Sequence, residues 1–286
     1  MDWPRISVVT PSYNQGEYLR EAMQSVLRQD YPDMEYLVID GGSTDGSAEI
    51  IRDLSDQLTH WVSEEDRGQS DALAKGFAAA SGDVLAWLNA DDLLYPHALR
   101  RVGRAFARRP GVDIVVGEVL YIDTQGQAGG YTSPPFPGFW DWRHELMRLG
   151  QPATFFRREA YERVGGVRLD LHFMMDGDLW RKIMMSGGRA HVLHEPLAFF
   201  RINKAGKQGD PDGFREEQER VHREWGISKA ARALAYYKMQ ALRIADGSHL
   251  RSRIKALAYR GLTAAEIWAQ ADRARSEAPT RGDRGT

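Results

Sequence analysis

The fold is decided by an apolar run that ends in an amide and two adjacent carboxylates: Val84-Leu85-Ala86-Trp87-Leu88-Asn89-Ala90-Asp91-Asp92. Such a run is typical of a buried strand, and the polar residues after it predict a loop at the strand's carboxyl end. Three similar runs precede it and alternate with helical patterns. Strands are therefore expected at 6–10, 35–40, 60–63 and 84–88, with helices around 19–27, 45–55 and 69–80. This alternation predicts an α/β fold, with a Rossmann-like, mainly parallel sheet and flanking helices.

The composition argues against several functional classes. The chain has 286 residues, of which 42% are apolar and 10% aromatic, so it can fill a core and wholesale disorder is not expected. Its 38 Lys and Arg against 40 Asp and Glu give a net charge of −2, which argues against a dedicated nucleic-acid-binding protein. The absence of cysteine excludes disulfides, thiolate zinc sites and thiol nucleophiles. No signal peptide or membrane-spanning run is visible, which predicts a soluble, cytoplasmic protein.

Polar residues that follow the expected strands are the first candidates for a functional site. The loops after parallel strands meet at one edge of the sheet, where α/β proteins bind ligands. The candidates at this edge are Tyr13, Asn14, Asp40, Asp66, Arg67, Asn89, Asp91 and Asp92. Asn14, with Glu17 three residues later, also predicts an N-cap pair for the first helix. Asp40 precedes a glycine-rich turn, and its carboxylate can accept hydrogen bonds from a base or a ribose.

Two acidic pairs each leave two interpretations open. Asp91 and Asp92 need a counter-charge, which a hard divalent cation bound to substrate phosphates can supply. The alternative is that one of them caps a helix that begins near Pro96. Asp176 and Asp178 precede an amphipathic helix, and local evidence favours a helix cap there. The alternative is that one of this pair is a general base.

The rest of the chain is less regular. We expect a loop over 123–140, strands at 153–157 and 190–202, a helix at 178–186, a linker over 206–228, a helical C-terminal segment over 229–272 and a disordered tail over 273–286. Residues 229–286 hold 12 Lys and Arg against 5 Asp and Glu, a local charge of +7. Two apolar stripes at helical spacing run through the C-terminal segment: Leu234, Tyr237, Ala241 and Ile244, then Leu250, Ile254, Leu257 and Ala258.

Several of these motifs, in this order, resemble those of family 2 glycosyltransferases. They are Val8-Val9-Thr10-Pro11-Ser12-Tyr13-Asn14, Val38-Ile39-Asp40-Gly41-Gly42-Ser43-Thr44-Asp45-Gly46, Asp66-Arg67-Gly68-Gln69-Ser70-Asp71-Ala72 and Trp87-Leu88-Asn89-Ala90-Asp91-Asp92. Asp176-Gly177-Asp178-Leu179-Trp180 resembles the later acidic motif of the family. The resemblance covers about residues 5–205. It implies a GT-A fold over 1–205, with a nucleotide-binding half over about 1–120 and an acceptor half over 121–205.

The resemblance also implies an activity and a set of roles. The activity is that of an inverting, metal-dependent, hexosyltransferase-type enzyme that moves a sugar from a nucleotide-diphosphate donor to a glycan or lipid-linked acceptor. Its setting would be bacterial cell-surface polysaccharide biosynthesis, with Mg²⁺ or Mn²⁺ as cofactor. The nucleotide-sugar-binding residues implied are Thr10, Pro11, Tyr13, Asn14, Asp40, Gly41, Arg67, Asn89, Asp91 and Asp92. Asp91 matches the metal ligand of the family's D-x-D motif, and Asp176 matches its catalytic base.

Two positions depart from the family pattern. Asn89 stands at the first acidic position of D-x-D, and Asn203 stands where the family often has a histidine metal ligand. A catalytically degenerate nucleotide-sugar-binding protein is therefore a second hypothesis. A nucleotidyltransferase is a third, disfavoured because the first loop lacks the glycine-rich, basic signature of that class.

The role of the C-terminal segment 229–272 stays open. It either packs as a helical hairpin on the catalytic domain, pairs two subunits in a homodimer, or docks peripherally on the inner face of a membrane. Its alanine-rich stripes favour packing or pairing. Trp140, Trp142 and Trp180 are expected to pack in the core or in loops rather than to stack on sugars. Gln151 is expected to be a solvated loop residue, the alternative being a contact to the acceptor.

Overall fold

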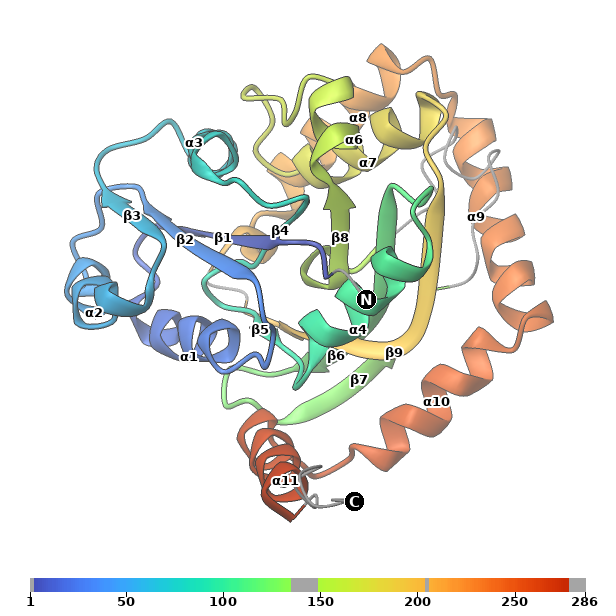
Figure 1. Ribbon diagram of the computed structural model, residues 1–286. Helices are drawn as coiled ribbons and strands as arrows, with labels where there is room; N and C mark the ends of the chain where they lie inside the picture. The colour runs from blue at the N-terminus through green and yellow to red at the C-terminus, as the bar shows by residue number, and fades with distance from the viewer. Residues whose placement is uncertain (1–2, 135–148, 204–205, 278–286) are drawn as a thin grey trace.

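The computed structural model describes residues 3–134, 149–203 and 206–277, and within them the strands form one nine-stranded sheet (Figure 1). The order across the sheet is β3-β2-β1-β4-β8-β6-β9-β5, with β7 paired to β6. The strands are β1 Ile6–Ser12, β2 Met34–Asp40, β3 His60–Ser63, β4 Val84–Trp87, β5 Leu93–Leu94, β6 Ile114–Ile122, β7 Ala128–Thr132, β8 Thr154–Arg157 and β9 Ala190–Arg201. The predicted α/β fold is confirmed.

The first four strands in the sheet order are parallel, and their carboxyl ends define one edge. β1 pairs in parallel with β2 and with β4, and β2 pairs in parallel with β3. β8 runs antiparallel between β4 and β6, with Phe156 facing Leu85 on one side and Ile114 on the other. The later strands therefore continue the same sheet, with β6 parallel to β9 and antiparallel to β7.

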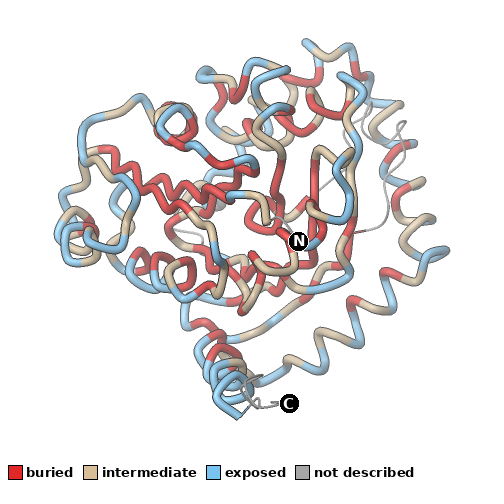
Figure 2. The backbone as a smooth tube through the Cα atoms, in the orientation of Figure 1, coloured by how far each residue is buried: buried red, intermediate tan, exposed pale blue. Residues whose placement is uncertain are grey.

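Helices cover both faces of the sheet, because alternate residues of its buried strands are apolar on both sides. In β1, Val8 faces a layer formed by α1, α2 and α4, while Val9 faces a layer formed by α3, α6 and α7. Figure 2 shows the buried chain running through the middle of these layers. The helices are α1 Gly16–Leu27, α2 Ser47–Asp53, α3 Gln69–Ala79, α4 Ala98–Arg108, α6 Arg158–Arg163 and α7 Met175–Met185, with the short turns η1 Ser55–Gln57 and η2 Gln151–Ala153.

Three expectations about the less regular part of the chain were wrong in detail. Strand β7 lies inside the expected loop 123–140, because its Gly129-Gly130 pair hides the usual alternation of a strand. The expected linker 206–228 contains helix α8 Pro211–Glu224, which has Asp210 as a side-chain N-cap and proline at its first position. Helix α11 Ala264–Glu277 extends into the expected disordered tail, whose residues 278–286 lie outside the described part of the chain.

The C-terminal segment forms three helices rather than a hairpin. Helix α11 packs into the fold, where Ile267 and Trp268 are buried against residues of β6, β7 and β9. Helices α9 Lys229–Ala245 and α10 Ser248–Ala258 run along one flank of the molecule, outside the sheet (Figure 1). The large apolar side chains of their two stripes are exposed, so the expected packing of these stripes on the catalytic domain was wrong, while pairing of two subunits and docking on a membrane stay open. No helix in the described ranges has the length and apolar character to cross a bilayer.

Candidate functional site

The acidic turn after β4 is the centre of the candidate site. Asp92 is buried and Asp91 is partly exposed. Helix α4 begins only at Ala98, after His97, and no side-chain cap is present at its start. The helix-cap interpretation of Asp91 and Asp92 was therefore wrong. Burial and the neighbouring Asp91 charge raise the pKa of Asp92 well above its usual range, and burial also raises the pKa of Asp91.

Arg201, at the end of β9, holds this turn in place. Its backbone N–H donates to Asp92 Oδ1 (2.9 Å), and its Nε donates to the Asp91 carbonyl (2.9 Å). Its guanidinium also donates to Glu21 Oε2 on α1 (2.7 Å) and to the carbonyls of residues 123 and 124. The Arg201 side chain is buried, whereas its partner Glu21 is 46% exposed. One residue thus ties the acidic turn to α1 and to the loop after β6.

The donor set at this turn fits a hard cation that is shared with a phosphate ligand. Asp91 offers a carboxylate that is partly desolvated, and a carboxylate in such a place gains most from a cationic partner. Across residues 3–134, 149–203 and 206–277, no three His, Asp or Glu side chains converge on a common cation position. Mg²⁺ and Mn²⁺ are commonly held by one or two carboxylates plus substrate phosphates and water. A cation here would therefore rest on Asp91 and the ligand.

The loop after β2 builds a rigid carboxylate at the same edge of the sheet. Asp40 is fully buried, and its two oxygens accept hydrogen bonds from the Ser43 backbone N–H (2.9 Å), the Ser43 hydroxyl (2.5 Å) and the Ser63 hydroxyl (2.7 Å). A Cβ atom added at Gly41 would lie 2.9 Å from Asp66 Oδ2, so any larger residue would require the Asp66 side chain to shift where these two loops meet. The first and second loops are also joined, because Asn14 Oδ1 accepts from the Thr44 N–H (2.9 Å).

The predicted binding residues at the end of β1 and in the loops after β1 and β3 differ in their exposure to solvent. Tyr13 is 62% exposed, and the Arg67 side chain is 74% exposed while it donates to Asp71 Oδ1 (2.6 Å). Thr10 is instead fully buried, with Oγ1 2.9 Å from the Tyr36 hydroxyl, and Pro11 is also buried. The side chains of Tyr13 and Arg67 are therefore accessible to a ligand.

The expected N-cap pair at the first helix was wrong. Gln15 is the N-cap of α1 and makes no side-chain cap bond. Asn14 has a positive φ of 50° and uses its side chain on the neighbouring loop instead. The Asn14 side chain bonds to the loop after β2 instead of to its own helix. That loop is about 30 residues away in sequence, so a local pattern does not reveal it.

Asp176 and Asp178 both lie in the first turn of α7, but their surroundings differ. Neither caps the helix, because Met174 is the N-cap residue and makes no side-chain cap bond. Asp178 is buried and ion-paired with Lys182 (3.2 Å) and Arg168 (3.8 Å). Burial raises the pKa of Asp176 to about 6, and the hydrogen bond it accepts from the Gly177 N–H (2.7 Å) only partly offsets this effect. Asp178 is thus structural, whereas Asp176 has the acidity of a general base.

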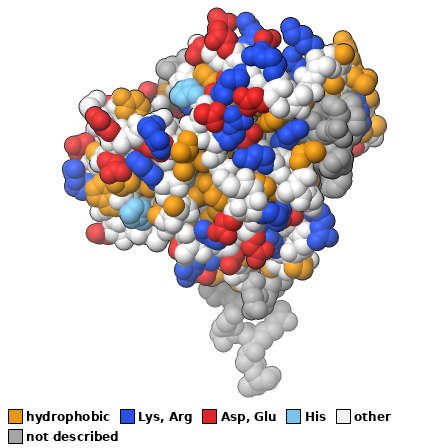
Figure 3. Space-filling view, turned by 90° about the horizontal axis from the view of Figure 1, so that it is seen from above, with side chains coloured by type: hydrophobic (Ala, Val, Ile, Leu, Met, Phe, Trp, Pro, Cys, Tyr) orange, Lys and Arg blue, Asp and Glu red, His pale blue; other side chains and the backbone are white. Residues whose placement is uncertain are grey.

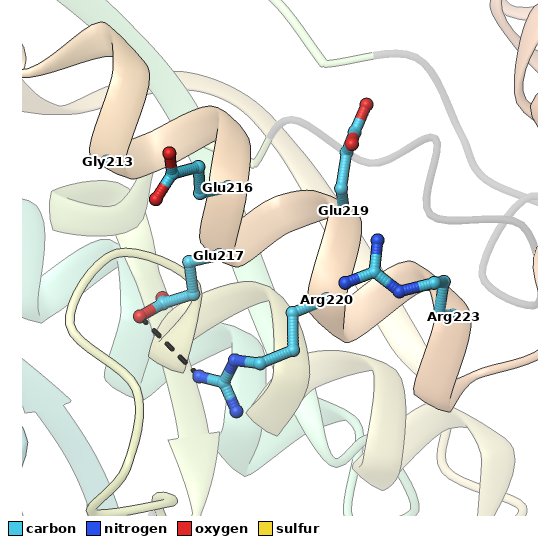
Figure 4. A pocket seen from close by; sticks show the side chains of 6 residues that line it. All are labelled: Gly213, Glu216, Glu217, Glu219, Arg220 and Arg223. Atoms are coloured by element: carbon cyan, nitrogen blue, oxygen red, sulfur yellow. Dashed lines mark ion pairs between the residues drawn. The ribbon is translucent and has the colours of Figure 1, made fainter.

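Glu217 of α8 positions the start of α7. Its carboxylate accepts the backbone N–H groups of residues 172, 173 and 174 at 2.7–2.8 Å. These are donors just ahead of the helix, where a negative charge is also favoured by the helix dipole. Figure 4 shows Glu217 and Arg220 on α8, pointing toward each other beside a hollow in the surface. This hollow is lined by α8 residues alone, among them Glu217.

Lys207, in the turn η3 Lys207–Gly209, connects the two acidic regions. Its Nζ donates to Gln69 Oε1 (2.6 Å) and to the His172 carbonyl. Gln69 Nε2 in turn donates to Asn89 Oδ1 (2.7 Å), and Asn89 Nδ2 lies 3.4 Å from Asp92 Oδ2. Burial lowers the pKa of Lys207 to about 8, while the charge of Asp176 acts in the opposite direction. A chain of hydrogen bonds therefore runs from a lysine near Asp176 to the acidic turn.

Two other predicted residues are also placed. Trp180 is buried and stacks on Trp87 in the core, as expected, whereas Trp140 and Trp142 lie outside the described residues. Gln151 was expected to be solvated, but it is buried and donates from Nε2 to the Trp87 carbonyl (2.7 Å). It therefore supports the backbone just ahead of the acidic turn.

The sequence did not identify Arg201, Lys207 or Glu217 as site residues. The proline at 211 after Asp210 is a helix-start signal that could have revealed α8 and hence Glu217. No local signal distinguishes Arg201 or Lys207, because their partners lie between 35 and 180 residues away.

Comparisons with known proteins agree with this arrangement. A family model described as Glycosyl transferase family 2 matches residues 7–165. An uncharacterised glycosyltransferase of Nostoc sp. is 32% identical over 240 residues, which cover 75% of this chain and 70% of the relative. The O-antigen biosynthesis protein RfbC of Myxococcus xanthus is 33% identical over 213 residues, 71% of this chain but 16% of RfbC. The mannosyltransferase PcManGT from Pyrobaculum calidifontis, solved with GDP-Man and Mn²⁺, has the same GT-A fold: the TM-score is 0.62 at 23% identity, covering 98% of this chain and 82% of that one.

Proposed function

Because this chain belongs to glycosyl transferase family 2, we propose that it transfers a hexosyl group from a nucleotide-diphosphate donor to an acceptor hydroxyl with inversion. The observation that carries the proposal is Asp176, a carboxyl group of pKa about 6 at the start of α7. At neutral pH such a group is ionised and still basic enough to take a proton from a hydroxyl in the transition state.

The donor would lie across the loops after β1, β2 and β3. Asp40 is fully buried, so it would shape the base and ribose site through the loop that it fixes. Tyr13 and Arg67 have the exposed side chains that can cover the nucleoside and meet the diphosphate. Asn14 and Gly41 would act through the loop shape that they fix, and buried Thr10 and Pro11 through the strand end that they support.

Asp91 would hold a Mg²⁺ or Mn²⁺ ion together with the donor diphosphate, whose growing negative charge a bound cation neutralises. Asp92, which is buried and accepts the Arg201 N–H, would support Asp91 from behind, beside the donor sugar. Asn89 would contribute a neutral oxygen, and its amide is already oriented by Gln69. Lys207 would add a positive charge on the same side.

In the reaction, Asp176 accepts the proton of the acceptor hydroxyl as the oxygen attacks the anomeric carbon. The bond between that carbon and the diphosphate oxygen breaks on the opposite side. This single displacement inverts the anomeric configuration and needs no enzyme nucleophile. It is also compatible with a chain that has no cysteine.

The acceptor we propose is a glycan or a lipid-linked glycan of the bacterial cell surface, used at the cytoplasmic side of the membrane. The similarity to RfbC, which is named for O-antigen biosynthesis, supports a polysaccharide setting. The complex of PcManGT with GDP-Man and Mn²⁺ supports a nucleotide sugar and a divalent cation as ligands.

The test is incubation of the full chain with a panel of UDP-, GDP- and dTDP-sugars, Mn²⁺ or Mg²⁺, and glycan or lipid-linked acceptors. Release of nucleoside diphosphate that is lost in Asp176→Asn supports the transferase. Binding without turnover for every donor and acceptor supports the second candidate, a catalytically degenerate nucleotide-sugar-binding protein, which Asn89 and Asn203 favour. Release of pyrophosphate would instead indicate a nucleotidyltransferase.

A further inference from the structure

Large apolar side chains are exposed along one flank of the molecule. Among the described residues, eleven large hydrophobic residues are exposed, and seven of them lie on α9 and α10: Leu234, Tyr236, Tyr237, Ile244, Leu250, Ile254 and Leu257. We call this set the flank stripe. Tyr237 is 70% exposed and Ile244 is 72% exposed. Scattered exposed hydrophobic residues are ordinary on a protein surface, but a concentration of them on two consecutive helices is typical of an interaction site.

Contacts on the inner faces of α9 and α10 orient the two helices so that the flank stripe points to solvent. Ala235 and Met239 of α9 are buried. On α10, the Ser252 hydroxyl accepts from the Ser133 N–H (3.0 Å), and Lys255 pairs with buried Glu118. Rotating either helix to hide the stripe would break these contacts. In Figure 3, apolar atoms gather at the right-hand margin, the side on which α9 lies in Figure 1.

The same two helices carry a strong positive charge. Residues 229–260 include eight Lys and Arg but one acidic residue, Asp246, which gives a local charge of +7. Lys229, Arg253 and Arg260 are exposed beside the flank stripe. By contrast, charges of both signs are mixed over the face of the molecule that Figure 3 shows. Arg168 and Arg220, which lie outside these two helices, both pair with Asp170.

We propose that α9 and α10 form a docking surface for an anionic lipid bilayer, with the flank stripe inserted at the headgroup boundary. Apolar residues flanked by basic residues are what binds a helix in the interfacial layer, and each basic residue near anionic lipid adds to the attraction. A second copy of this chain is the less suitable occupant, because a symmetric contact through the stripe would bring two segments of charge +7 together.

The test is sedimentation of the full chain with vesicles of phosphatidylcholine alone and of phosphatidylcholine mixed with phosphatidylglycerol. No donor or acceptor is present, so the result is independent of the proposed transferase activity. We expect binding to the anionic vesicles, weakened by salt, and roughly tenfold or more weaker partitioning in a Leu234→Ser, Tyr237→Ser, Ile244→Ser variant. A Lys229→Gln, Arg253→Gln, Arg260→Gln variant should lose the salt-sensitive part.

Leu169→Ser is the matched control, because Leu169 is also exposed but lies outside the two helices. It should bind like the natural chain. The proposal is overturned if the folded chain does not bind anionic vesicles, or if the serine variant binds as well as the control. Concentration-dependent dimerisation that the serine variant abolishes, in a chain that ignores vesicles, would assign the flank stripe to a second copy instead.

Discussion

Replacing Asp176 by asparagine should move activity and stability in opposite directions. Asparagine keeps an oxygen to accept the Gly177 N–H but cannot take a proton. Transfer should therefore fall by about 10²–10⁴-fold, while donor affinity is retained. In the natural enzyme, turnover should rise with pH through about 6, as Asp176 loses its proton. Release of nucleoside diphosphate from the donor selected by the panel measures both effects.

The stability change follows from the same pKa. The carboxyl group of Asp176 has a pKa of 3.8 in the unfolded chain and of about 6 in the folded one. Above pH 6 the folded protein therefore carries an ionised carboxylate in surroundings that favour its neutral form. The difference corresponds to at most about 3 kcal/mol of lost stability. This penalty is absent below pH 3.8 and complete above pH 6, so Asp176→Asn should be more stable than the natural chain at pH 7.5. The gain should disappear as the pH falls through 6 toward 4, which urea unfolding at several pH values can follow.

Asp178→Asn is the control for this prediction. Asp178 lies on the same turn of α7 but is paired with Lys182 and Arg168, so its replacement should lower stability at pH 7.5 and leave turnover per folded molecule near normal. Near-normal turnover in Asp176→Asn, or an equal stability difference at pH 5 and pH 7.5, would refute the assignment of Asp176 as a desolvated base.

Three further predictions concern the rest of the site. Asp91→Ala should fold but lose the Mn²⁺-dependent part of its affinity for nucleoside diphosphate, and calorimetry that finds this affinity unchanged would refute the cation assignment. Affinity for nucleoside diphosphate should fall as the pH rises through about 8 and Lys207 loses its charge, and Lys207→Gln should bind weakly without this pH dependence. Arg201→Met should lower the free energy of unfolding by about 3–5 kcal/mol, because it leaves the carbonyls of residues 91, 123 and 124 without their donor and removes a positive charge that acts on buried Asp92. The backbone N–H bond to Asp92 is kept. A loss below 1 kcal/mol in urea unfolding would show that the turn is held by other contacts.

The sequence was most informative where function and local structure coincide. The alternation of apolar strands and helices over the first hundred residues predicted β1 to β4, and strand ends placed Asp40 and Asp91 at one edge. Such strands are short, nearly continuous apolar runs, which local patterns reveal well.

What the sequence could not predict are contacts between distant segments. Arg201 reaches Glu21 across 180 positions, and Lys207 reaches Gln69 across 138. The fate of the flank stripe was missed for a related reason. An amphipathic helix has an apolar face whether or not the fold supplies something to cover it, so only the packed structure distinguishes a buried stripe from an exposed one.

The continuity of the sheet has a consequence for how substrates enter and products leave. Strand β8 is hydrogen-bonded to β4 on one side and to β6 on the other, so the two parts of the chain share one ladder. A hinge between them would have to break that ladder, at a cost of several backbone hydrogen bonds. Opening and closing must therefore come from the loops at the sheet edge. Turnover should then respond more to glycine and proline substitutions in those loops than to changes in the strands that link the two parts.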